Sequence, residues 1–155
     1  MASVKGWELF AHPEFTAQLE RLVAAVARAK AKDPKGYAKT ANAKLLAQLE
    51  ALVWDIIPAD PAHPSYRQGV TLGPAHKHWF RAKFGGGRFR LFFRYRTDAK
   101  IIVYAWVNDQ DTLRTYGART DAYAVFKSML DDGSPPDDWR QLVKQSTPLA
   151  ADPPE

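Results

Sequence analysis

Cationic side chains gather in the middle of the chain, where they could bind phosphate. No acid lies between Asp60 and Asp98. This stretch contains eight lysines and arginines: Arg67, Lys77, Arg81, Lys83, Arg88, Arg90, Arg94 and Arg96. Two nitrogens of one guanidinium can donate to two oxygens of a phosphate, so arginine is well suited to a polyanion. The segment therefore predicts a nucleic-acid-binding surface, and the alternative is a solvated basic face neutralised by acids elsewhere in the chain.

Aromatic residues are interleaved with these cations, and bases could stack on them. The candidates are Trp79, Phe92, Tyr116 and Tyr123. Unpaired bases of single-stranded RNA often stack on such rings. Tyr116 and Tyr123 are the stronger candidates, because they lie in or just after a polar segment. Trp79 and Phe92 belong to apolar strands, where core packing explains them.

The same segment could cut RNA without histidine or glutamate. Cleavage requires that the 2′-hydroxyl loses a proton, that the phosphate is stabilised, and that the leaving 5′-oxygen gains a proton. The basic segment contains no Glu. A lysine or tyrosine whose pKa is lowered by surrounding arginines could move the protons instead. The segment is thus compatible with a ribonuclease as well as with a simple binding module.

Other motifs give weaker evidence for metal chemistry. His76 and His78 would share one strand face, but no third ligand is evident, so surface histidines are the simpler interpretation. Asp109, Asp111 and Asp121 could hold Mg²⁺ in a metal-dependent nuclease, although turn and helix-capping roles explain them as well. We therefore expect no metal and no cofactor.

The elements that must position these residues follow from hydrophobic periodicity. Strands are predicted at residues 7–10, 78–84, 88–96 and 101–107, and helices at 13–30, 37–57, 122–129 and 135–142, with a long loop at 58–74. Strand alternation places Arg81 and Lys83 on the same face as the even-numbered arginines of the next strand. The two early helices would cover the opposite face, which leaves the arginine-rich face open. This pattern predicts an α+β fold built on a small antiparallel sheet.

Composition limits the size and location of the protein. The chain has 155 residues, a net charge of +5 and no cysteine. This size suits one domain, which we place at residues 1–145, followed by a polar, proline-rich flexible tail at 146–155. No uninterrupted apolar stretch approaches the roughly 18 residues of a membrane helix, and no secretory signal is evident. The expected location is the cytoplasm, without a membrane partner.

Several blocks of the sequence resemble the YhaV family of type II toxins. The central block spans residues 81–95, and further blocks span 6–13, 105–109, 113–117 and 121–123. Their order and spacing agree over nearly the whole chain. The resemblance implies a RelE-like fold, in which a small antiparallel sheet carries two N-terminal helices on one face and a C-terminal helix. It also implies metal-free cleavage of mRNA together with the ribosome, and inhibition by a PrlF-type antitoxin.

The resemblance further implies roles for residues of the basic segment. Arg81 and Lys83 would hold or activate the scissile phosphate, and Arg90 would stabilise the charge of the transition state. Further contacts with RNA would come from Arg67, Arg88, Arg94 and Tyr116.

Beyond the basic segment, the implied roles compete. Arg114 or Arg119 would act on the phosphate from the other side, and the loop after Asn108, which is longer than in RelE, leaves both possible. Tyr123, or else Tyr116, would stack on a base or assist proton transfer. A non-catalytic nucleic-acid-binding module that uses the same basic face is the alternative function.

Overall fold

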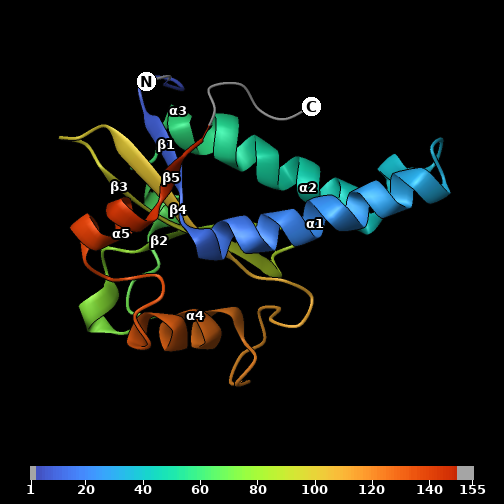
Figure 1. The fold of residues 1–155 in the computed structure, drawn as a ribbon. Coiled ribbons are helices and arrows are strands. Elements are labelled where there is room, and N and C mark those ends of the chain that lie inside the picture. The colour runs from blue at the N-terminus through green and yellow to red at the C-terminus, as the bar shows by residue number, and fades with distance from the viewer. Residues whose placement is uncertain (1–2, 150–155) are drawn as a thin grey trace.

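A five-stranded sheet forms the centre of the computed structural model, which describes residues 3–149 (Figure 1). Its strands are β1 (Glu8–Ala11), β2 (Phe80–Phe84), β3 (Phe89–Arg96), β4 (Ile101–Val107) and β5 (Thr147–Pro148). They lie in the order β2-β3-β4-β1-β5. β1 runs parallel to β4, and the other neighbours are antiparallel. The predicted α+β fold with a small antiparallel sheet is confirmed, with one parallel pair added.

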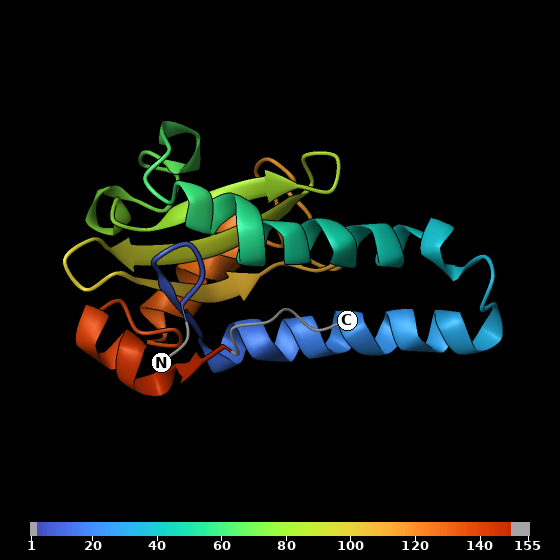
Figure 2. The ribbon, with the colours of Figure 1, turned by 90° about the horizontal axis from the view of Figure 1, so that it is seen from above.

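Two long helical segments cover one face of the sheet (Figures 1 and 2). They consist of α1 (Pro13–Lys32), the 3-10 turn η1 (Tyr37–Lys39), α2 (Ala41–Ala51), the π-helical turn η2 (Leu52–Ile56) and α3 (Ile57–Ala59). The His12 side chain accepts from the Glu14 N–H, and Pro13 supplies the first helical φ of α1. Thr40 caps α2 by accepting from the Ala43 N–H. Both helices predicted here are confirmed.

The core on this side joins the helices to strands β1, β2, β3 and β4. Phe15 of α1 and Leu49 of α2 are buried against Leu91, Phe93 and Tyr104 of the sheet. The Tyr104 hydroxyl donates to the carbonyl of Val53 at 2.7 Å, so this buried polar group is satisfied. Strand alternation therefore sends one set of side chains into this core and the other set to the opposite face.

The opposite face is covered as well, so the expectation that it is open was wrong. The remaining helical segments are η3 (Pro64–Tyr66), η4 (Pro74–His76), α4 (Ala122–Asp131) and α5 (Trp139–Gln145). α4 lies across this face, where the Phe126 ring stacks on Phe92 with centroids 4.2 Å apart and meets Trp79 edge-on. The physical reason is that this face carries large apolar side chains between its cations, and these need cover.

The end of the described chain returns to the sheet. Asp138 caps α5, and Thr147–Pro148 then pairs with β1, although residues 146–155 were predicted as a flexible tail. Residues 150–155 of that tail lie outside the described residues, and the division into a domain and a tail stays a prediction. Within residues 3–149, no helix is both long and apolar enough to cross a membrane.

Candidate active site

One tyrosine hydroxyl accepts hydrogen bonds from two arginines on neighbouring strands. Arg81 Nε of β2 and Arg90 Nε of β3 lie 2.9 and 3.0 Å from the Tyr123 hydroxyl oxygen. Tyr123 is in the first turn of α4, where its backbone N–H donates to the Asp121 carboxylate. The helix cap therefore fixes the ring, and the ring aligns two guanidinium groups that the strands alone would leave free to move.

Arg90 is held more firmly than the other cations. Its side chain is only 6% exposed, and its terminal nitrogen donates to the carbonyls of Gly87 and Phe89 at 2.8 and 3.0 Å. Three consecutive glycines with positive φ, Gly85–Gly87, form the turn that presents the first of these carbonyls. The backbone N–H of Arg90 donates to Asn108 Oδ1. This guanidinium is buried among neutral acceptors.

No carboxylate neutralises this pair of arginines. Among the described residues, neither Arg81 nor Arg90 forms an ion pair. Arg81 instead donates to the carbonyl of Ser65 at 2.6 Å. Lys83 pairs directly with Arg90 in the β2–β3 register and is exposed, as is Arg88. Like charges opposite each other destabilise a sheet, so this arrangement favours an anion bound between them.

Arg114 approaches the same tyrosine from the loop before α4. Its guanidinium lies 4.7 Å from the centre of the Tyr123 ring and 3.7 Å from that of Tyr116. It also donates to Asp121 Oδ1 at 2.6 Å, in an ion pair whose two side chains are both largely buried. Arg119 is exposed and has no hydrogen bond or ion pair within residues 3–149. The geometry thus favours Arg114 over Arg119 for the contested role.

The carboxylate of Asp121 organises this corner of the site. Burial raises its pKa, but hydrogen bonds from Arg114 and from the backbone N–H groups of Thr115 and Tyr123 outweigh burial and bring the pKa below its usual value. Asp121 is therefore ionised at neutral pH. It acts as a helix cap and an ion-pair partner, which are the structural roles that competed with metal binding.

Not all of the predicted site residues join the cluster. Arg94 lies at the other end of β3, where its guanidinium is 5.4 Å from the rings of both Trp79 and Trp139. It donates to the backbone carbonyl of Asp137. Arg67 is exposed at the outer edge of β2, where it forms a bridge with Phe80. Arg81, Lys83, Arg90, Arg114, Tyr116 and Tyr123 are brought together, with Arg88 beside them.

The chain matches known proteins along most of its length. Residues 9–147 match the family Toxin_YhaV, described as a toxin with endonuclease activity, of toxin-antitoxin system. The chain belongs to the YhaV toxin family. It is 47% identical over 144 residues to the ribonuclease toxin YhaV of Escherichia coli K12, and this alignment covers 92% of the chain and 94% of the relative. The toxin YhaV of Escherichia coli O157:H7 matches with the same identity and coverage. No solved structure matches the chain.

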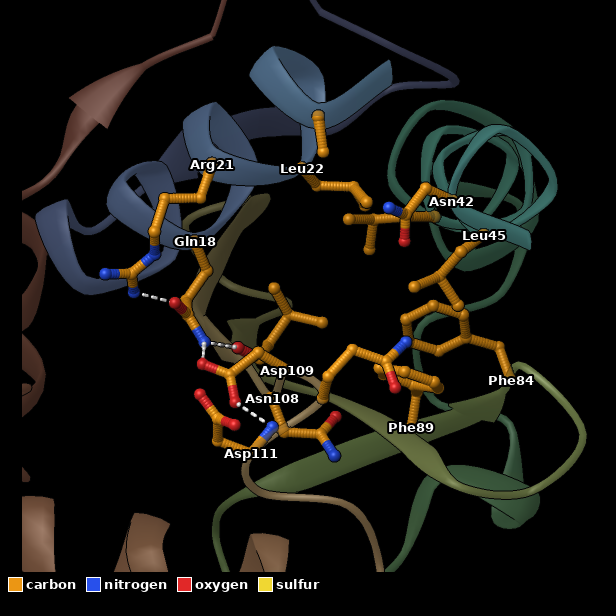
Figure 3. A pocket seen from close by; sticks show the side chains of 14 residues that line it. Gln18, Arg21, Leu22, Asn42, Leu45, Phe84, Phe89, Asn108, Asp109 and Asp111 are labelled. Carbon is orange, nitrogen blue, oxygen red and sulfur yellow. Dashed lines mark hydrogen bonds between the residues drawn. The ribbon is translucent and has the colours of Figure 1, made fainter. Parts of the chain in front are cut away.

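A cleft in this YhaV-family chain lies on the opposite side of the sheet from Tyr123. It has a volume of about 300 Å³ and lies between α1, α2 and the ends of β3 and β4 (Figure 3). Leu22, Leu45 and Phe89 give it an apolar wall, and Asp109 lies at its polar rim. None of the residues predicted to bind or cut RNA lines it, although Asp109 and Asp111, which were considered as Mg²⁺ ligands, do. Asn108 links it to the arginine cluster, since this residue lines the cleft and also accepts from the Arg90 N–H.

A second polar cluster contains the two histidines considered as metal ligands. Asp137 Oδ1 accepts from His76 Nδ1 and His78 Nε2 at 2.9 Å each and from Trp79 Nε1 at 2.8 Å. Asp137 is thus a third potential ligand that the sequence analysis missed, because it is 59 residues from His78. A carboxylate only accepts hydrogen bonds, so each nitrogen carries its proton here. The cluster ties the start of β2 to the segment before α5.

Proposed function

We propose that this chain is a metal-free endoribonuclease that cuts mRNA as the toxin of a toxin-antitoxin pair. The observation that carries the proposal is the convergence of Arg81 and Arg90 on the Tyr123 hydroxyl without a carboxylate partner. A buried cation that lacks an anionic partner is costly, and an RNA phosphate would supply the missing negative charge. The family's endonuclease activity and the ribonuclease activity named for the relative from Escherichia coli K12 agree with this chemistry.

The proposed reaction uses the 2′-hydroxyl of the RNA as the nucleophile. Its oxygen forms a bond to phosphorus while the bond from phosphorus to the 5′-oxygen breaks, which leaves a cyclic phosphate and a 5′-hydroxyl end. Arg81 and Lys83 hold the phosphate, and Arg90 stabilises the extra negative charge of the crowded transition state. Arg114 acts from the side of α4. The 2′-hydroxyl loses its proton to a side chain of the site and the leaving 5′-oxygen gains a proton, and Tyr123 takes part in these transfers or stacks on the neighbouring base.

The partners that we propose follow from this function and from the resemblance. The substrate is mRNA engaged by the ribosome, and Arg88 and Tyr116 contact it next to the reacting phosphate. The inhibitor is an antitoxin, because a toxin of such a pair needs one, and the resemblance to the YhaV family implies that it is of the PrlF type. The site of action is the cytoplasm, where mRNA is translated.

The test compares RNA ends made by the wild type and by Arg90→Ala. Each protein is expressed by brief induction of a tightly repressed promoter, and new 5′-hydroxyl ends are mapped in extracts that contain EDTA. Arg96→Ala is the matched control, because Arg96 lies on the same strand but pairs with Asp98 outside the cluster. We expect new ends with the wild type and with Arg96→Ala, and none with Arg90→Ala.

The same experiment separates the alternative functions. Toxicity or RNA binding without new ends would favour the non-catalytic binding module and would remove the catalytic roles given above. Because EDTA also dismantles ribosomes, the role of a metal is tested with purified protein on ribosome-free RNA, where ends that appear only without EDTA would favour a metal-dependent nuclease. The ion pair of Asp121 with Arg114 and the hydrogen bonds of Asp109 to Gln18 and Thr112 argue against that second outcome.

A further inference from the structure

The helical hairpin formed by α1 and α2 extends past the end of the sheet (Figure 2). α1 has 20 residues, which corresponds to about 30 Å of helix. Its buried residues, Phe15 and Gln18, both belong to its first two turns. The distal half of α1 therefore packs mainly on α2, and most of its surface faces solvent. The hydrophobic core of the protein does not require α1 to extend so far past the sheet.

This extension is the second strongly basic part of the chain, after the segment between Asp60 and Asp98. Residues 21–49 contain one acid, Asp33, and seven cations: Arg21, Arg28, Lys30, Lys32, Lys35, Lys39 and Lys44. Seven cations less one acid give it a net charge of +6, beside +8 for the segment between Asp60 and Asp98, so the positive charge of the chain is divided between these two parts and the remaining residues are acidic on balance. All seven cations are exposed, and none forms an ion pair within residues 3–149. The sequence analysis placed the positive charge only in the segment between Asp60 and Asp98.

The hairpin is attached to the end of the sheet that carries the candidate active site. Gln18 of α1 donates to the carbonyl of Val107, the last residue of β4, at 2.9 Å. Gln48 of α2 accepts from the Gly85 N–H at 2.9 Å. Gly85 begins the glycine turn whose carbonyl at Gly87 holds Arg90. An RNA bound at Arg90 would therefore lie beside the base of the hairpin, with its flanks within reach of the seven cations.

We propose that this basic hairpin binds the phosphate backbone of double-helical RNA. The inference rests on the proposed function, because an enzyme that cuts mRNA on the ribosome works among folded RNA. Binding of single strands uses aromatic platforms, but Tyr37 is the single aromatic residue in this segment, and Lys30 lies over its ring. Lysines on a rigid rod instead match phosphates, which position a protein on a duplex without reading its sequence.

The test measures binding of a labelled 20-base-pair RNA duplex to protein whose cleavage of RNA is strongly reduced. All proteins carry Tyr123→Phe, and the test variant adds Lys30→Gln, Lys32→Gln and Lys35→Gln. The matched control adds Lys127→Gln, Arg140→Gln and Lys144→Gln, which removes the same charge from α4 and α5. Glutamine preserves helix propensity, and thermal unfolding checks that both triple variants fold.

We expect the hairpin variant to bind the duplex at least tenfold more weakly than the control at 0.1 M salt. The slope of log Kd against log salt should fall by about two to three, since each phosphate contact contributes roughly 0.9. Equal affinity and equal slope in the two variants would overturn the inference. So would a hairpin that binds an acidic peptide such as oligoglutamate more tightly than the duplex. Failure of the proposed function gives a different result, because RNA ends would then be missing while duplex binding still depends on the hairpin.

Discussion

Arg90 Nε lies 3.0 Å from the hydroxyl oxygen of Tyr123, a contact between a buried arginine on β3 and the first turn of α4. The same oxygen accepts from Arg81 on β2. Two neighbouring strands of one hairpin and a helix that begins about 30 residues later are thus joined at one atom. Any change to that atom should alter the catalytic geometry more than it alters the stability of the fold.

Replacing Tyr123 with phenylalanine removes that oxygen and keeps the ring. We expect RNA cleavage to fall by about 10²- to 10⁴-fold, the usual contribution of a positioned proton donor or acceptor. The free energy of unfolding should fall by only about 1–3 kcal/mol, because Arg90 keeps its two carbonyl acceptors. Quantified RNA ends and urea denaturation give the two values. Tyr95→Phe, on the other face of β3, is the control, and cleavage by Tyr123→Phe within threefold of it would contradict the assignment.

Replacing Asn108 with alanine should damage the site indirectly, through the position of Arg90. This buried amide accepts from the Arg90 N–H and donates to the carbonyls of Arg88 and Thr112. Its loss leaves a buried N–H and two carbonyls without partners, which should cost about 2–4 kcal/mol of unfolding free energy. Cleavage at a temperature where the variant is still folded should fall as well. Full activity there would mean that Asn108 does not position Arg90. Gln110→Ala, two residues away, is the control for the loop.

The pH dependence of stability should reveal the Asp121 ion pair. Its pKa in the folded protein is below the unfolded value of roughly 3.9, so its stabilising effect is complete above that value and is lost as the pH falls through the lower, folded pKa. At pH 7, Asp121→Asn should reduce the unfolding free energy by about 1–3 kcal/mol. Urea denaturation from pH 7 to pH 2.5 should show this difference shrinking below about pH 4. A difference that stays constant over this range would argue against an ionised Asp121. Asp132→Asn, at an exposed residue, is the control.

Truncation of Phe126 tests whether α4 is packed on the sheet as described. Its ring is fully buried between Phe92, Trp106 and Trp79. Phe126→Ala should destabilise the protein by about 3–5 kcal/mol, because it leaves a cavity between α4 and the sheet. Lys127→Ala, one residue along on the exposed side of α4, should cost less than about 0.5 kcal/mol. Similar melting temperatures for both variants would show that this face is open, as the sequence analysis expected.

The difference between expectation and structure on this face has a physical explanation. Alternation along β2 and β3 correctly assigned Arg81, Lys83 and Arg90 to one face, since side chains alternate strictly in a strand. Alternation does not show which distant helix covers that face. Phe92, between Arg90 and Arg94, was the available signal, because a large apolar side chain among cations indicates that something packs over it.

The loop before α4 was harder to predict for a related reason. Residues 109–121 have no periodicity, so the choice between Arg114 and Arg119 depended on three-dimensional contacts with Tyr123. Likewise, His76 and His78 were identified as a pair, but their partner Asp137 comes from the segment before α5. Contacts between residues so far apart in the sequence are not encoded in local patterns.

The strand order has a consequence for folding during synthesis of the protein. β1 is made first, yet it pairs with residues 101–104 of β4 and 147–148 of β5. The first strand to leave the ribosome must therefore wait for most of the chain before it finds its neighbours. The central sheet that carries Arg81 and Arg90 is therefore completed late in translation. During most of its synthesis, the chain does not yet have an assembled arginine cluster.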